Sequence, residues 1–175
     1  MNTATAYFAR GFHDAGRESI KNLQQTGFPD YQALPVTFLY RHALETALNG
    51  LIWEGDEIAR ATGTRAPSGD LGPTKSNHDL ETLLPFAEHV MKAFNFTWDV
   101  AQITWAEAKD MIAEFSKIDP GSFAFRYPMT KRGDPSADQS FGFNVLSLAK
   151  RLDPVLDQLS TFSFALEDIA WNELT

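Results

Sequence analysis

The sequence predicts a single all-α domain over residues 1–175, built from about five helices. Apolar residues recur at three- and four-residue steps along most of the chain, which is the spacing of one face of a helix. Stretches rich in Gly and Pro separate these helical patterns. A chain of 175 residues is typical of one domain. The Phe-rich stretch 123–128 favours a brief extended segment, but one such segment does not make a sheet.

The first two helices carry the clearest patterns. The first is expected over Thr3–Gln24, with a buried face made of Phe8, Phe12, Ala15, Ser19 and Leu23. A turn at 27–30 follows. The second starts near Pro35, a favourable first helical position, and Gly63 suits its end. Its stripe predicts a central core helix and consists of Val36, Leu39, Tyr40, Ala43, Leu44, Ala47, Leu48, Leu51, Ile52, Ile58 and Ala59.

A long Gly/Pro-rich loop, 63–77, precedes the third helix. This helix is expected to begin at about Asp79, with Ser76, Asn77 and His78 as candidate caps. Pro85 is expected either to shift its start or to kink it.

The last two helices complete the predicted fold. The fourth is expected over 100–117, with Ala101, Trp105, Ala108, Met111, Ile112 and Phe115 on its buried face. A second long connection, 119–138, leads to the last helix at about 138–172. Pro154 lies inside that helix and predicts a kink or a break into two helices.

Composition and motifs exclude several classes of protein. The absence of cysteine excludes disulfide scaffolds, cysteine-based zinc sites and thiol catalysis. Neither a signal peptide nor a membrane-length apolar run is found, so a cytoplasmic location is expected. The net charge of −8 argues against a general nucleic-acid binder. No P-loop, GxGxxG, GxSxG, HExxH or Glu-x-x-His motif is present, so no metal or other cofactor is expected.

Candidate site residues begin with a polar edge on the second helix. Steps of three and four place His42, Glu45 and Asn49 on one side of that helix, next to Arg41. A carboxylate so close to the core needs a partner, because burying an unpaired charge is costly. One interpretation is a flanking polar face held by ion pairs. The other is a buried polar network with a role in a site.

Two further segments carry candidate residues. His78 lies at a helix start, where it either caps the helix, hydrogen-bonds across to the second helix, or acts as an acid or base beside a second group. Arg126, next to Tyr127 and before Pro128, either ties a loop to an acid such as Glu45 or contacts an anion. The basic pairs 131–132 and 150–151 are interpreted as solvated surface.

Three segments together resemble the HEPN superfamily of helical domains. They are 38–48 (FLYRHALETAL), 78–83 (HDLETL) and 125–128 (FRYP), followed by a long last helix. The resemblance implies an up-and-down helical bundle, usually a homodimer, and a place in toxin–antitoxin, anti-phage or RNA-processing systems. Active members are metal-independent ribonucleases that carry an Arg followed, after four to six residues, by a His.

This chain departs from that motif, since no Arg is followed by His at the required spacing. Inactive relatives serve as binding or accessory modules, which makes such a module, binding a protein partner or a nucleotide-like ligand, the leading hypothesis. The alternative is a divergent endoribonuclease in which Arg126 stabilises charge on phosphorus, His78 acts as acid or base, and Glu45 orients it. A third hypothesis, compatible with the first, has Glu45, His78 and Arg126 in one buried structural network.

Overall fold

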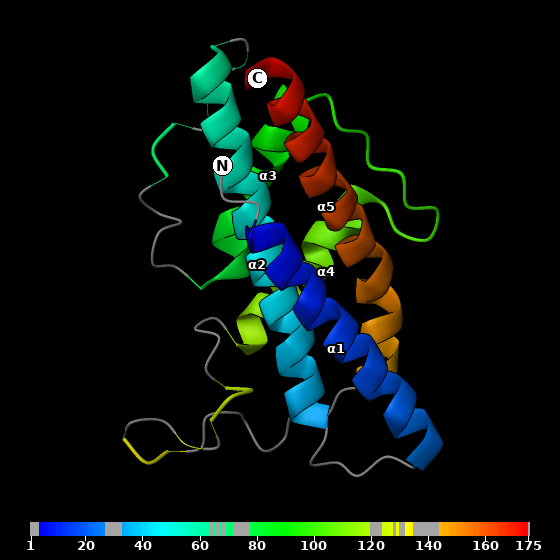
Figure 1. Cartoon of the computed structure of the whole chain (residues 1–175). Coiled ribbons are helices and arrows are strands. Elements are labelled where there is room, and N and C mark those ends of the chain that lie inside the picture. The colour runs from blue at the N-terminus through cyan, green and yellow to red at the C-terminus, as the bar shows by residue number, and fades with distance from the viewer. Residues whose placement is uncertain are drawn as a thin grey trace.

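Five helices form the regular structure of the described residues in the computed structural model (Figure 1). They are α1 (Ala4–Thr26), α2 (Ala33–Thr62), α3 (Leu80–Ala93), α4 (Trp105–Ile118) and α5 (Val145–Leu174). The structure describes residues 4–26, 33–63, 65, 67, 69–71, 78–119, 124–127, 129, 132–134 and 144–174. The predicted all-α helical bundle is confirmed.

Helix α2 is the central element, as its apolar stripe predicts. It packs against α1, α3 and α5, while α4 packs against α3. Its fully buried side chains include Tyr40, Leu44, Leu48, Leu51, Ile52 and Ile58. In Figure 1, α2 runs through the middle of the molecule, with α1 in front of it and α3 and α4 behind it.

Contacts between residues of neighbouring helices show in which direction α1 and α3 run relative to α2. In the first half of α2, Arg41 contacts His78, which lies two residues before α3, and farther along, Gly55 lies against Val90 in the second half of α3. Helices α2 and α3 therefore run in the same direction, although they are consecutive. In contrast, Gly16 of α1 lies against Tyr40, and Thr5 lies against Gly50, so α1 and α2 are antiparallel.

The buried face of α1 differs from the predicted one. Phe8 is 63% exposed and Ala15 is also exposed. The buried residues of α1 are mainly small and include Ala6, Ala9, His13, Gly16 and Leu23. A Cβ atom added at Gly16 would lie 3.0 Å from the ring of Tyr40. Small residues let α1 approach α2 closely, and this close fit takes precedence over the burial of larger apolar side chains.

The starts of α3 and α4 are set by capping side chains. Asp79 caps α3 by accepting from the backbone N–H of Glu81, so His78 is not the cap, and Pro85 does not delay the helix. Helix α4 begins at Trp105, five residues later than predicted. Thr104 and Glu107 form a capping box there, in which each side chain accepts from the other residue's backbone N–H.

Helix α5 is uninterrupted from Val145 to Leu174, so it does not break into two helices at Pro154, and the alternative of a kink there stays a prediction. Proline lacks a backbone N–H, so the carbonyl of Lys150 loses its usual helical donor. The predicted first turns of this helix, residues 138–143, lie outside the described residues. None of the helices in the described ranges combines the length and apolar character that a membrane crossing requires.

Gly55 marks the closest approach of α2 and α3. A Cβ atom at this position would lie 2.4 Å from Cγ1 of the buried Val90, so Gly55→Ala should force the helices apart. We expect the free energy of unfolding to fall by about 1–3 kcal/mol in urea denaturation. The matched control is Gly11→Ala on α1, where nothing lies within 4 Å. It should gain about 0.5–1 kcal/mol, since alanine favours helix. An unchanged midpoint for Gly55→Ala would contradict the close approach.

Candidate functional site

Arg41 is fully buried, with 0% of its surface exposed. Its Nη1 donates to Oε2 of Glu45 at 2.9 Å, and its Nε donates to the carbonyl of Asp119 at 3.1 Å. Its Nη2 donates to the carbonyl of His78. Burial lowers the pKa of Arg41, although the carboxylates of Glu45 and Asp119 favour the charged form. Arg41 thus joins α2, the start of α3 and the end of α4 through hydrogen bonds in the protein interior.

Glu45 connects this buried guanidinium to an exposed imidazole. Its Oε2 accepts from Arg41, and its Oε1 lies 2.6 Å from Nδ1 of His78. An ionised carboxylate only accepts hydrogen bonds, so Nδ1 of His78 carries the proton. The side chain of His78 is 55% exposed. Glu45 therefore orients the ring and leaves Nε2 as the acceptor of a neutral imidazole, or as a donor once the ring is protonated.

Hydrogen bonds fix the backbone next to His78. Ser116 of α4 donates to Oδ1 of Asp79 and accepts from the backbone N–H of Leu80 at 3.0 Å. Thr82 donates to Oδ2 of Asp79 at 3.0 Å. Partial burial disfavours the charged carboxylate, yet these hydrogen bonds outweigh it and lower the pKa of Asp79. The position of His78 is therefore set by both α3 and α4.

His42 packs among aromatic rings beside this pair. It stacks on Phe38 with ring centroids 5.4 Å apart, and it meets Phe12 of α1 edge-on at 4.3 Å. Burial lowers the pKa of His42, and the positive charges of Arg126 and Arg41 lower it further, while a nearby carboxylate opposes them. The imidazole is consequently neutral at pH 7, so His42 contributes a ring surface rather than a charge.

The segment that carries Arg126 is anchored just before it. The backbone N–H of Ala124 donates to Oδ1 of Asp119 at 2.9 Å. The ring of Phe125 is buried and lies 5.8 Å from that of Phe115 in α4. These two contacts attach the segment to the end of α4. Asp119, which accepts from Ala124, also accepts from Arg41 through its backbone carbonyl.

Arg126 extends over aromatic rings at the surface. Its guanidinium carbon lies 5.7 Å from the ring centroid of Phe38 and 5.7 Å from that of Tyr127. Arg126 and Tyr127 are both exposed. The hypothesis of one buried network is thus only partly right, because Arg126 lies outside the buried part. The buried charged members are Arg41, Glu45 and Asp119.

We call Arg41, His42 and Glu45, together with His78 and Arg126, the α2 edge. The structure brings these predicted residues to one side of α2, and Asn49 follows one turn later, half-buried. Asn77, Pro128 and Lys131 lie outside the described residues. Arg132, Lys150 and Arg151 are exposed, as predicted for solvated basic pairs. Within the described ranges, no group of three or more His, Asp and Glu side chains is arranged to hold a metal ion.

A second polar cluster, between α1, α2 and α5, was not predicted. Oδ1 of Asp153 lies 2.8 Å from Nε2 of His13, which is 1% exposed, and accepts from the hydroxyl of Tyr40 at 2.9 Å. Arg17 donates to Asp153 at 3.2 Å and to Asp157 at 2.5 Å. Burial and the charge of Asp153 raise the pKa of Tyr40, so its hydroxyl keeps the proton that it donates.

One sequence signal pointed to this cluster. His13 follows Ala6 and Ala9 and precedes Gly16 at three- and four-residue steps, which places it on the face of small residues. A histidine on a buried face requires a polar partner. The identity of that partner, 140 residues away in the chain, depends on how the helices pack.

Comparisons with protein-family models, curated proteins and solved structures found no match to this chain. The HEPN assignment and the homodimer remain predictions.

Proposed function

We propose that this chain is a non-catalytic HEPN-like binding module, and that the α2 edge binds the phosphate and base of a nucleotide or a short RNA. The observation that supports this most directly is an exposed, Glu45-oriented His78 on the same side of α2 as an exposed Arg126. A guanidinium group, and an imidazole once it is protonated, donate hydrogen bonds to phosphate oxygens. The resemblance adds an accessory role in a toxin–antitoxin, anti-phage or RNA-related system.

Aromatic surface at the α2 edge supports a ligand with a flat base. Arg126 lies over Phe38 and Tyr127, and Tyr127 is 48% exposed. Bases stack on such rings without regard to sequence. The chain's net charge of −8 weakens long-range attraction to polynucleotides, which favours a mononucleotide or a short strand over a long duplex. Buried Arg41 offsets the charge of Glu45, and Arg126 places a positive charge at the exposed face of the site.

Nucleotide binding tests the proposal. We expect adenosine and guanosine phosphates or a short single-stranded RNA to bind in calorimetry, and Arg126→Ala to weaken binding about tenfold or more through the loss of a charged hydrogen bond. The control is Arg10→Ala, since Arg10 is an exposed arginine on α1 that pairs with Asp14. Arg126→Ala should leave the melting temperature nearly unchanged, because its side chain is exposed. Failure of every nucleotide and RNA to bind would reject the proposal.

The Glu45–His78 hydrogen bond favours a second candidate function, a metal-independent endoribonuclease. A carboxylate that orients an imidazole is a recurrent arrangement in acid–base catalysis. His78 would take the proton of an RNA 2′-hydroxyl as the 2′-oxygen attacks phosphorus, and Arg126 would stabilise the charge that develops there. The P–O5′ bond breaks and the leaving 5′-oxygen takes a proton from water, which leaves a 2′,3′-cyclic phosphate and a 5′-hydroxyl.

Incubating purified protein with RNA and EDTA separates the two candidates. If the chain is a binding module, the RNA stays intact while it binds. Cleavage to cyclic-phosphate ends that is lost in His78→Ala and retained in Arg10→Ala would establish the enzyme instead.

A further inference from the structure

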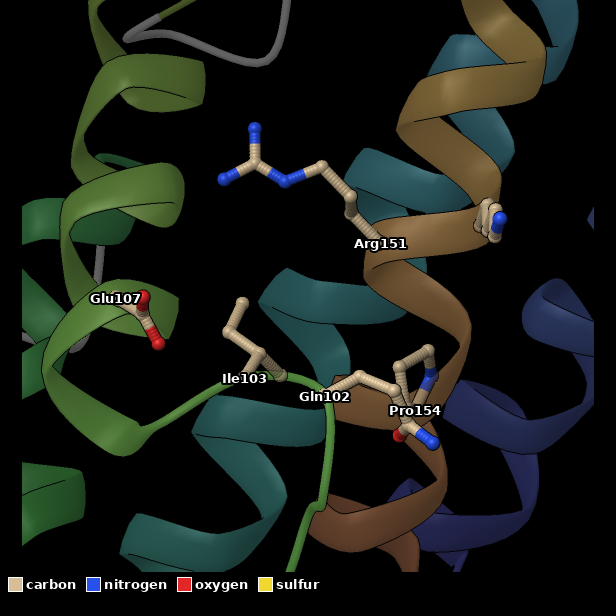
Figure 2. A pocket seen from close by; sticks show the side chains of 6 residues that line it. Gln102, Ile103, Glu107, Arg151 and Pro154 are labelled. Atoms are coloured by element: carbon tan, nitrogen blue, oxygen red, sulfur yellow. The ribbon is translucent and has the colours of Figure 1, made fainter.

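An open cavity lies at the other end of α4 from the α2 edge (Figure 2). Its volume is about 440 Å³, and it is lined by Gln102, Ile103, Glu107, Lys150, Arg151 and Pro154. Helix α4 has 14 residues and is therefore about 21 Å long. The cavity adjoins the first turn of that helix, whereas Asp119, at its end, accepts a hydrogen bond from Arg41 of the α2 edge. The two sites are thus separate, and we call this one the α4–α5 pocket.

The α4–α5 pocket carries two positive charges, on Lys150 and Arg151, and one negative charge, on Glu107. Among the described residues, neither Lys150 nor Arg151 forms a hydrogen bond or a salt bridge. Figure 2 shows the guanidinium of Arg151 extending from α5 into the space between α5 and α4. Although the chain has a net charge of −8, the two adjacent cations leave this concave surface with a net positive charge. Such a pair attracts an anion.

Glu107 is the acidic residue in the lining, and its carboxylate is already engaged. Its Oε2 accepts from the backbone N–H of Thr104 at 2.8 Å and from the hydroxyl of Thr104 at 2.7 Å. These capping bonds hold Glu107 against the start of α4, as part of the turn that begins the helix. The charges of Arg151 and Glu107 attract each other, but no hydrogen bond joins them among the described residues, so the guanidinium keeps its donors for a ligand.

The other lining residues form an apolar surface with polar groups at its edge. Ile103 is buried and Pro154 is half-buried, so their side chains form an apolar wall beneath the cations. Pro154 leaves the carbonyl of Lys150 without its helical donor, and Gln102 offers an exposed amide. Small-molecule sites combine an apolar lining of this kind with a few polar groups that orient the ligand.

We propose that the α4–α5 pocket binds a small organic anion. Arg151 and Lys150 hold its phosphate or carboxylate group, and Ile103 and Pro154 contact its apolar body. Arg151 contributes most to the interaction, because its planar guanidinium binds two oxygens of either group at once.

Titration of the full chain with phenyl phosphate, phenylacetate and inorganic phosphate tests this proposal. We expect saturable shifts of the amide NMR signals of Ile103, Glu107 and Arg151. Inorganic phosphate should bind more weakly than phenyl phosphate because it lacks the apolar body. The stronger of the two aromatic probes identifies the preferred anion.

Variants of the exposed cations complete the experiment. Arg151→Ala should weaken binding of the better probe about tenfold, and Arg151→Lys should weaken it less. Arg10→Ala, far away on α1, should have no effect, and thermal melts should show that all three variants are folded. Three results would overturn the proposal: no saturation below about 10 mM, shifts confined to the α2 edge, or unchanged affinity in Arg151→Ala.

Discussion

Replacing Arg41 with alanine is expected to lower the free energy of unfolding by about 3–5 kcal/mol, the range typical of a broken buried ion pair. Its guanidinium is fully buried and donates to Glu45, to the carbonyl of Asp119 and to the carbonyl of His78. Removing it leaves the buried carboxylates of Glu45 and Asp119 without their compensating charge. It also removes the donor that joins α2 to the start of α3 and the end of α4.

Urea denaturation of Arg41→Ala, Arg41→Lys and Arg126→Ala would measure this effect. Lysine keeps the charge but not the three-way hydrogen-bonding geometry, so its loss should be intermediate. Arg126 is exposed, so its alanine variant serves as the control and should change the unfolding free energy by about 0.5–1 kcal/mol at most. Equal losses for Arg41→Ala and Arg126→Ala would contradict the assignment of Arg41 as the buried centre of the α2 edge.

The sequence was sufficient to predict which residues form the α2 edge, but not how deeply each side chain is buried. A four-residue step puts Arg41 and Glu45 on one side of α2, and the need of a buried carboxylate for a partner follows from the cost of burying charge. Whether His78 or Arg126 meets Glu45 depends on how three separate segments pack. Arg41, expected on a polar flank, is buried because groups from two other segments accept its hydrogen bonds.

Two helix predictions failed for different physical reasons. On α1, large apolar residues were expected to face the core, yet Phe8 is exposed because small residues allow the close packing of α1 on α2. Hydrophobicity alone does not predict which of these two faces of α1 is buried. On α4, the sequence did contain the start signal, since Thr104 and Glu107 have the spacing of a capping box. The apolar residues Val100 and Ala101 before them extended the helical pattern beyond its true start.

A glutamate in the core provides the second large expected effect. Glu54 of α2 is 5% exposed, and no described residue hydrogen-bonds either of its carboxylate oxygens. Burial, with the negative charges of Glu167 in α5 and Glu57 in α2, raises its pKa from 4.5 to about 7. Burial also raises the pKa of Glu167. Glu54 is therefore largely protonated below neutral pH and is forced to ionise above it.

This shift makes stability fall as the pH rises. The folded-state pKa of Glu54 is above its unfolded value of 4.5, so folding favours the protonated form. The stability that this preference contributes is fully present below about pH 4.5 and is lost as the pH rises through about 7, at a total of about 3 kcal/mol. The lowered pKa values of Asp79 and Asp153 act in the opposite direction, and their effect lies at more acid pH.

Glu54→Gln should remove this pH dependence, because an amide of nearly the same shape has no charge to bury. We expect the variant to be more stable than the parent protein by about 1–3 kcal/mol at pH 8 and to match it at pH 5. Urea denaturation at half-unit steps between these values would give both profiles. The control is Glu114→Gln on α4, where the side chain is exposed. Profiles of Glu54→Gln and parent that stay parallel from pH 5 to 8 would show that Glu54 does not ionise in the folded core.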